Sequence, residues 1–391
     1  MTTAPLTVPA KSSLGSAAGY GAFLACSWTW CIGMFLPVLL VRDFGVWGWV
    51  VFAVPNVVGA MAMGGIPRSQ QAVADLRSRH LPALKLFSLV TIAFHLFFNS
   101  WIIRRLLPDF GPSLTIGMAI IMYLLIARPN PRDLFLSAVV LVVSYVVLLL
   151  AGFTGGLDTL PSRGPLASTP NLRSLAAVCC FGFLLCPYLD LTFHRVRQSA
   201  GALLAPSAFV LGSFCFFGVI LVFSRRYAPF LAPIINDPSA LNHARTPAFI
   251  LGLYFSLQSA FTVAVHAREL IGTVAPANRG RAIALAVAVF VVSVILGIIS
   301  QEPLRFFGLA GGEVFYRCFM GFYALYFPAY LYLCIIPPRT TPLIYIILML
   351  LTTPLFFAAF ILNHMPLLFP ALAIILLAKL LPHKPQITNN K

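Results

Sequence analysis

The chain has 391 residues, of which 60% are hydrophobic and only 9% charged, and its mean hydropathy is +0.93. Soluble globular domains carry about 25% charged residues, so this composition excludes a water-soluble protein and indicates a membrane protein whose main partner is the lipid bilayer. Twenty-six basic residues against ten acidic ones give a net charge of +16. These charges are scattered between apolar runs, which excludes a basic groove for nucleic acid.

In chain order, a polar segment, 1–16, leads straight into the first apolar run without a small-residue cleavage site, so we expect no cleaved signal peptide. A spanning helix needs about 20 mostly apolar residues. Such runs predict an all-α polytopic fold with about twelve transmembrane helices, near 17–41, 46–65, 84–103, 112–127, 132–153, 173–192, 202–223, 246–268, 281–300, 315–336, 340–361 and 364–381. They leave no room for a soluble domain.

The distribution of basic residues predicts the orientation. With both termini inside, sixteen Lys and Arg residues lie on the inner side and ten on the outer side. This excess follows the positive-inside rule, although Arg104–Arg105 and Arg225–Arg226 lie on the outer side. We therefore expect a multi-pass protein of the cell membrane with cytoplasmic tails at 1–16 and 382–391.

An internal repeat links the first and sixth predicted helices. Residues 31–39 and 180–189 share Cys, Gly, Leu, Pro and Leu in the same order, with one residue inserted before the second proline. Proline removes a backbone hydrogen bond, so both helices are expected to break at mid-membrane, where unwound backbone is tolerated if it faces a cavity or a bound solute. The alternative is a pair of kinks that only shape packing. The predicted binding residues at the breaks are Gly33, Met34, Phe35, Pro37, Gly182, Cys186, Pro187 and Tyr188.

Five helices separate the two breaks, so the halves 17–153 and 173–337 enter the membrane from opposite sides, and 340–381 adds two helices. This 5+5 inverted repeat with broken helices 1 and 6 resembles the LeuT-type fold of the amino acid-polyamine-organocation superfamily. The hairpin Trp28–Trp49 and the segment Gly182–Pro187 followed by Arg195 are most similar to the sodium:solute symporters. The resemblance implies a secondary transporter that works by alternating access, with helices one, two, six and seven rocking against three, four, eight and nine.

Asp190 is the one carboxylate expected inside an apolar run, three residues after Pro187. A charge at that depth is costly unless it is paired, hydrated or protonated. Asp190 could bind a cation, hold a substrate amine or carry a proton. The alternative is a structural pair with Arg195 or His194.

Two further helices carry polar candidates. His95 and Asn99 lie four residues apart on one face of the third helix, where they either border the cavity or form packing hydrogen bonds. Gln258, Ser259 and Thr262 lie in the eighth helix, which supplies hydroxyls to sodium in the family that the chain resembles. No adjacent pair of hydroxyl residues occurs in this run, so Na⁺ near Ser259 and Thr262 and H⁺ both remain open as coupling ion. The hydroxyls could instead bond to carbonyls one turn earlier.

The eight cysteines lie in apolar runs without a CxxC motif and are interpreted as packing residues rather than ligands of a soft metal. We find no Walker lysine motif, GxSxG or HExxH, and expect neither an enzyme nor a cofactor beyond a coupling ion. The leading prediction is a secondary transporter of a small solute. The alternatives are a membrane-embedded transferase, with His95 or His194 as base, and a sensor or assembly protein that does not transport.

Overall fold

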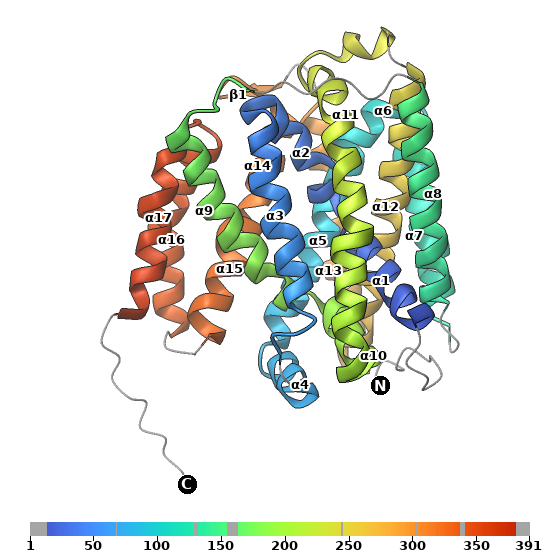
Figure 1. Cartoon of the computed structure of the whole chain (residues 1–391), viewed down its shortest axis with the longest axis vertical. Helices are drawn as coiled ribbons and strands as arrows, with labels where there is room; N and C mark the ends of the chain where they lie inside the picture. The colour runs from blue at the N-terminus through green and yellow to red at the C-terminus, as the bar shows by residue number, and fades with distance from the viewer. Residues whose placement is uncertain are drawn as a thin grey trace.

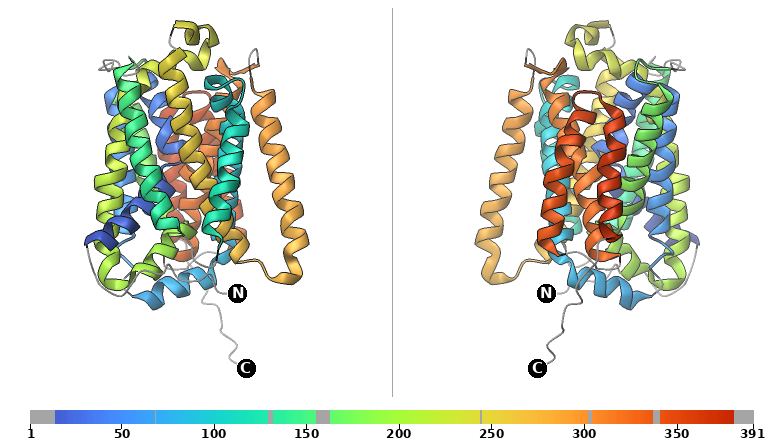
Figure 2. Two further views of the ribbon diagram at one scale, coloured as in Figure 1. Left: turned by 90° about the vertical axis from the view of Figure 1, so that its right-hand side faces the viewer. Right: turned by 90° about the vertical axis from the view of Figure 1, so that its left-hand side faces the viewer.

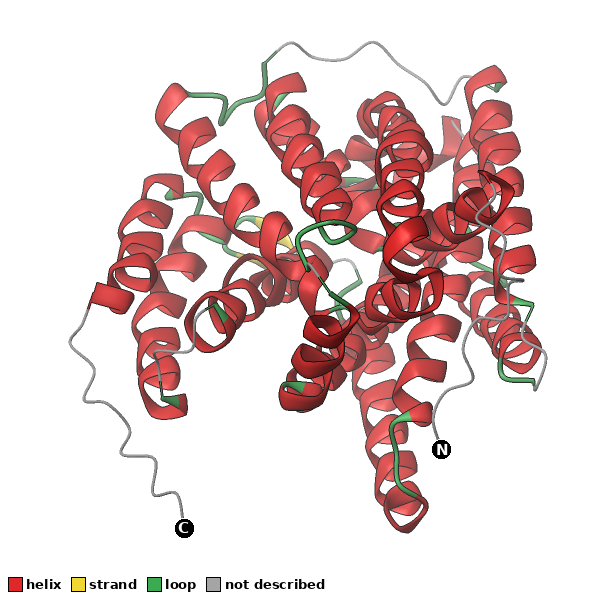
Figure 3. Cartoon of the chain, turned by 60° about the horizontal axis from the view of Figure 1, so that its bottom comes forward, coloured by secondary structure: helices red, strands yellow, loops and turns green. Residues whose placement is uncertain are grey.

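The structure is a computed structural model that describes residues 14–67, 69–128, 132–154, 163–243, 245–301, 304–336 and 341–380. Apart from one small β-hairpin, the described elements are helices (Figure 3). The first half holds α1 (Leu14–Trp28), α2 (Cys31–Phe44), α3 (Val46–Ala62), α4 (Gln70–Arg79), α5 (Leu81–Phe98), α6 (Arg104–Leu106), α7 (Gly111–Ile126) and α8 (Asp133–Phe153). The second half holds α9 (Thr169–Leu185), α10 (Leu191–Val210), α11 (Gly218–Asn236), α12 (Arg245–Gly272), α13 (Arg279–Ile299), α14 (Gly311–Gly321), α15 (Phe327–Tyr330), α16 (Pro342–Phe360) and α17 (Leu368–Leu377).

Short elements connect these helices. The π-helical stretches are η1 (Asn99–Ile103), η3 (Leu211–Phe217), η6 (Phe322–Tyr326) and η7 (Leu331–Ile335), and the 3₁₀ turns are η2 (Cys186–Leu189), η4 (Pro238–His243), η5 (Pro276–Asn278), η8 (Met365–Leu367) and η9 (Ala378–Leu380). Strands β1 (Arg305–Phe306) and β2 (Leu309–Ala310) pair antiparallel. Their turn contains Phe307 and Gly308, both with positive φ.

The helices form a bundle whose outer surface is apolar, as expected of a multi-pass membrane protein. Among the described residues, eight helices are long and apolar enough to cross a membrane, or nine when the bent pair α1 and α2 counts as one span. Three shorter apolar helices lie at Val46–Ala62, Gly111–Ile126 and Met365–Leu380. The prediction of many membrane spans is confirmed at this level, whereas the number twelve and the inverted repeat stay predictions.

The bundle brings the two broken helices together. The first helix, α1, packs against α10 and η3, while α2 packs against α11 and α3 against α9. Helix α12 lies against α5, α7 and α8, and α13 stands at the periphery (Figure 2). The first described helix begins and the last one ends at the same end of the bundle, the lower end in Figure 1. The predicted tails at 1–16 and 382–391 fall almost wholly outside the described residues.

The first break lies earlier than the sequence predicts. Residues 33–37 are regular helix within α2, and the chain instead breaks at Thr29 and Trp30, where α1 and α2 meet at a bend of 57°. Side-chain donors accompany the shift, because they add hydrogen bonds to carbonyls at the end of α1, where the helical hydrogen-bond ladder stops. The hydroxyl of Thr29 bonds Ala25 O at 2.7 Å, and the Trp30 indole donates to Ser27 O.

The second break lies close to its predicted place. Pro187 has no N–H, α9 ends at Leu185, and the 3₁₀ turn Cys186–Leu189 is followed by Asp190 in an extended conformation. Gly182 remains helical. A second irregularity follows at Gly201, whose φ of 71° kinks α10.

Candidate functional site

The two breaks face a very small central cavity. It has a volume of about 10 Å³, room for about one water molecule. Its lining residues are Trp28, Trp30, Ile32, Gly33, Asn56, Phe183, Cys186 and Tyr323. The Trp28 indole donates to Asn56 Oδ1 at 2.6 Å, and the Trp30 and Tyr323 rings pack against each other with centroids 5.4 Å apart. Aromatic side chains from three segments therefore close the space between the breaks.

A narrow cleft leads from the upper end of the bundle toward this cavity. It has a volume of about 60 Å³ and lies between α2, α9 and α14. Most of its walls are apolar, with Asp43 and Arg317 among the lining residues. Phe183 and Tyr323 line both the cleft and the cavity, so these two side chains separate them.

Several residues predicted at the breaks lie elsewhere. Gly33 and Cys186 line the cavity, whereas Met34, Phe35 and Pro37 do not. Met34 and Phe35 are buried in the regular turns of α2, and the Tyr227 hydroxyl donates to Met34 O at 2.5 Å. The predicted site residues Gly182, Pro187 and Tyr188 are also absent from the cavity lining, and Gly182 instead borders the upper cleft.

His95 connects the third predicted helix to the first break. Its Nδ1 lies 2.7 Å from Thr91 O, and its Nε2 lies 3.2 Å from the backbone nitrogen of Cys31. Since Thr91 O can only accept, the bound proton belongs on Nδ1 and Nε2 accepts from Cys31 N–H. The neutral imidazole therefore caps the start of α2. Asn99 Nδ2 donates to His95 O at 2.7 Å, and the described residues offer its Oδ1 no partner.

Asp190 caps the start of α10, and its carboxylate does not form the structural pair with Arg195 or His194 that was the alternative prediction. Its Oδ1 accepts from the backbone nitrogen and the hydroxyl of Thr192, at 2.7 and 2.8 Å. The predicted partner His194 lies instead 2.8 Å from Tyr188 O through its Nε2, and Arg195 pairs with other carboxylates. Asp190 Oδ2 is fully buried and has no hydrogen-bond partner in the described part of the chain. A negative charge on a buried carboxylate of this kind is costly unless a proton, a cation or a water molecule compensates it.

The eighth predicted helix, now α12, places oxygens against α1. Thr262 Oγ1 lies 3.5 Å from Cys26 O. Ser259 Oγ is buried without a partner in the described segments, and the Gln258 amide nitrogen donates to Ser144 Oγ at 2.7 Å. Hydroxyl and carbonyl oxygens suit a hard cation such as Na⁺, although this set includes no carboxylate. Among the described residues, no cluster of three or more His, Cys, Asp or Glu could hold a metal ion.

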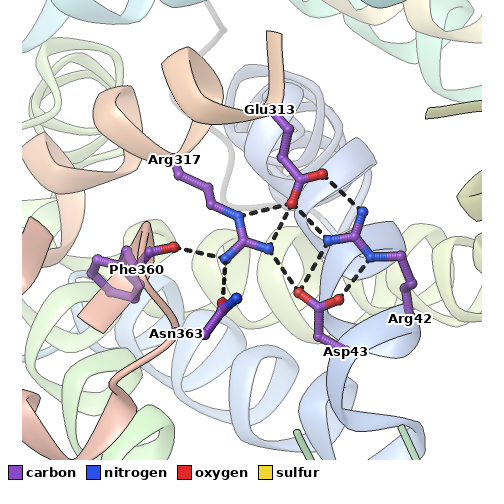
Figure 4. Close-up of polar contacts among 6 residues, drawn as sticks. All are labelled: Arg42, Asp43, Glu313, Arg317, Phe360 and Asn363. Atoms are coloured by element: carbon purple, nitrogen blue, oxygen red, sulfur yellow. Dashed lines mark hydrogen bonds and ion pairs between the residues drawn. The ribbon is translucent and has the colours of Figure 1, made fainter. Parts of the chain in front are cut away.

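A network of four charges closes the upper end of the bundle (Figure 4). Glu313 accepts from Arg42 at 2.6 and 2.8 Å and from Arg317 at 2.6 and 2.9 Å. Asp43 pairs with the same two arginines, at 2.7 and 2.8 Å. Arg317 also donates to Phe360 O, beside the turn that joins α16 to α17. We call these four charged residues the upper quartet; it ties α2 to α14.

A second network closes the lower end. Asp133 Oδ2 pairs with Arg195 at 2.8 Å and with Arg268 at 2.9 Å, and Glu269 Oε1 pairs with the same arginines at 3.0 and 3.1 Å. All four side chains are buried. We call them the lower quartet; it joins α10 to α8 and α12. Like the upper quartet, it contains two arginines and two carboxylates and is electrically neutral.

Asp190, predicted as the one carboxylate inside an apolar run, is not the only carboxylate hidden from solvent, because Asp133, Glu269 and Glu313 are also at most 1% exposed. These three acids lie at or beside the ends of the predicted helices 132–153, 246–268 and 315–336. The four-residue spacing of Glu313 and Arg317 within one helical run was an available signal for the upper quartet. Comparison with known proteins gives no matching family model and no matching curated sequence.

Proposed function

We propose that the protein is a secondary active transporter that moves a small solute by alternating access. The observation that carries this proposal is the pair of neutral charge quartets, which close opposite ends of a bundle whose first and sixth predicted helices are both broken at its centre. Each quartet includes the outer part of one broken helix: Arg42 and Asp43 on α2, and Arg195 on α10.

The breaks provide hinges for such a cycle. When the upper quartet separates, α2 can tilt about Thr29 and Trp30 and widen the upper cleft down to Phe183 and Tyr323. When the lower quartet separates, the start of α10 can tilt about Asp190 and expose the same centre from below. Two closures that open in turn around one central site are the requirement for alternating access.

Coupling to an ion would use the unpartnered oxygens near the breaks. Asp190 Oδ2 is the candidate for a proton or a cation, and Ser259 Oγ with Thr262 Oγ1 and Cys26 O is the candidate for Na⁺. The solute would replace the aromatic contacts of Trp30 and Tyr323 at the centre. The predicted orientation, with both termini inside, would make the lower quartet the cytoplasmic closure.

The tight central cavity favours a second candidate, a sensor or assembly protein that does not transport. A space of about 10 Å³ holds no solute in this conformation, so the aromatic side chains must move before anything can bind. The transferase alternative gains less support, because the His95 and His194 rings each hydrogen-bond a backbone carbonyl, and neither ring hydrogen-bonds the Asp190 carboxylate.

Uptake into liposomes separates these functions. Purified protein is reconstituted and offered labelled amino acids, sugars or organic cations under a sodium gradient, a proton gradient or neither. We expect gradient-driven accumulation of one solute class, and inhibition by a permeant maleimide that the variant Cys186→Ala relieves, because Cys186 lines the cavity. Cys334→Ala, at the lower end of the bundle, is the matched control. Absence of uptake under every gradient would favour the sensor and contradict the transporter.

A further inference from the structure

A lipid-facing groove runs between α3 and α11, which stand side by side in Figure 1. The groove has a volume of about 680 Å³, and its lining residues are almost all apolar. Small residues create it: Ala53 and Cys215 lie along it, and a side chain at Gly218 would meet only Ser213 O, at 3.9 Å. These small side chains leave a groove between α3 and α11 that larger side chains would fill.

The groove has the length of one leaflet. Its α3 wall runs from Trp49 to Met61, about 18 Å at 1.5 Å per residue. Half of the hydrocarbon core of a bilayer is about 15 Å thick. One extended acyl chain of a lipid can therefore lie along the groove within a single leaflet.

A cation that has no counter-ion among the described residues lies at the upper end of the groove. The Arg225 guanidinium stacks over Trp49, 5.7 Å from the ring centre, and the Trp49 indole donates to Leu221 O at 3.0 Å. Arg225 Nε is buried without a partner in the described regions, and no ion pair of this residue occurs there. The nearby Arg42 and Arg317, by contrast, are both neutralised within the upper quartet.

We propose that this groove binds an anionic phospholipid, with one acyl chain between α3 and α11 and the phosphate on Arg225. A guanidinium recognises a phosphate oxygen with charge-assisted hydrogen bonds, and Trp49 occupies the position typical of interfacial tryptophans. The charge of Arg225 decides between occupants, because an apolar helix of a partner would supply no anion to it, and the described part of this chain supplies none either. A phospholipid matches both features, because its acyl chain fits the apolar groove and its phosphate pairs with the cation at the end of the groove.

Native mass spectrometry of the full-length protein in detergent tests this site. The probes are palmitoyl-oleoyl phosphatidylglycerol, which is anionic, and the zwitterionic phosphatidylcholine with the same chains. We expect one phosphatidylglycerol to bind about fivefold more tightly than phosphatidylcholine. Arg225→Gln should remove this preference and Arg225→Lys should keep most of it. Arg226→Gln, the adjacent and exposed arginine, is the matched control and should change nothing.

A second pair of variants tests whether the acyl chain lies in the groove. Gly218→Leu should fill the groove and lower the affinity for both lipids at least tenfold, whereas Gly117→Leu, at another glycine with open space around it, should not. Equal effects of the Arg225 and Arg226 changes would overturn the proposal, and so would unchanged binding to the Gly218 variant. If the parent protein forms dimers and Gly218→Leu dissociates them, the groove binds a second copy of the chain instead of a lipid. Displacement of the lipid by excess glycerol 3-phosphate would show that the acyl chain contributes nothing.

Discussion

Glu313→Gln tests whether the upper quartet holds the upper end closed. The Glu313 carboxylate accepts four hydrogen bonds, two from Arg42 and two from Arg317. Glutamine keeps the shape of the side chain but removes its charge and turns one acceptor into a donor that faces the guanidinium groups. Asp43 would then face two arginines alone, and the quartet would carry a net charge of +1.

The size of the effect follows from burial. Removal of one partner from a fully buried ion pair costs about 3–5 kcal/mol. The Arg42 and Arg317 side chains are 19% and 12% exposed, so water screens part of this cost. We therefore expect Glu313→Gln to destabilise the closed form of the upper end by about 2 kcal/mol relative to the open form. This corresponds to an approximately thirtyfold shift of the equilibrium toward the open form.

Cys179 reports this opening, because it lines the upper cleft and is only 5% exposed. The more accessible cysteines are first replaced by serine; they are Cys180, Cys215, Cys318 and Cys334. A membrane-impermeant maleimide should then label Cys179 up to about thirty times faster in Glu313→Gln than in the parent protein. Asp109→Asn, which changes an exposed carboxylate at the same end, should leave the rate unchanged.

The lower quartet supplies the decisive comparison. Glu269→Gln removes a carboxylate from the opposite end, so it should not accelerate labelling of Cys179 and is expected to slow it by favouring the form that is open below. An unchanged rate in Glu313→Gln would refute the role of the upper quartet. Equal acceleration by both variants would indicate general loosening of the bundle rather than closure at a specific end.

Three further changes give direct outcomes. Gly59→Ala would place a Cβ 1.9 Å from Phe183 O, so α3 and α9 would have to separate. We expect thermal unfolding to show a loss of about 3 kcal/mol in the free energy of unfolding. The control Gly117→Ala, at a glycine with open space around it, should be neutral or slightly stabilising. Asp190→Asn retains the helix cap but not the charge, so the protein should fold normally while solute uptake in liposomes loses its dependence on the ion gradient. Burial and the neighbouring Arg79 lower the pKa of His80 below its ordinary value. The neutral His80 ring should therefore contribute its full stability above about pH 6.5, and this contribution should be lost as the pH falls through the lower pKa of the folded state. On acidification, the Tm of the parent protein should fall more than the Tm of His80→Gln.

Local chemistry explains which features were predictable. Pro187 removes a donor whatever surrounds it, and the second break indeed follows directly on α9. The first break depends instead on the Thr29 hydroxyl and the Trp30 indole, which end α1 before the proline at 37 is reached. A proline inside a helix lowers its stability, but the neighbouring hydrogen bonds decide where the chain bends.

The quartets could not be predicted, because their partners are distant in the sequence. Arg42 and Glu313 are 271 residues apart, and each lies near the end of an apolar run, where a charge is ordinary. The same difficulty applies to Asp190, whose expected partner Arg195 is taken by Asp133 and Glu269. Spacing within one helix predicts neighbours on that helix, whereas pairing between helices depends on how the whole bundle packs.

The composition of the quartets suits reversible closure. A buried ion pair adds little net stability, because desolvation of its charges offsets most of their attraction. If one end opened as proposed, water would hydrate two arginines and two carboxylates, and this hydration would compensate for the broken contacts. A closure made of packed leucines would recover nothing on exposure to water, and its cost would grow by about 25 cal/mol for each Å² uncovered. In the proposed transport cycle, a neutral quartet would therefore open at a modest cost as a complete unit. The burial of its charges would penalise any arrangement that leaves one partner unpaired.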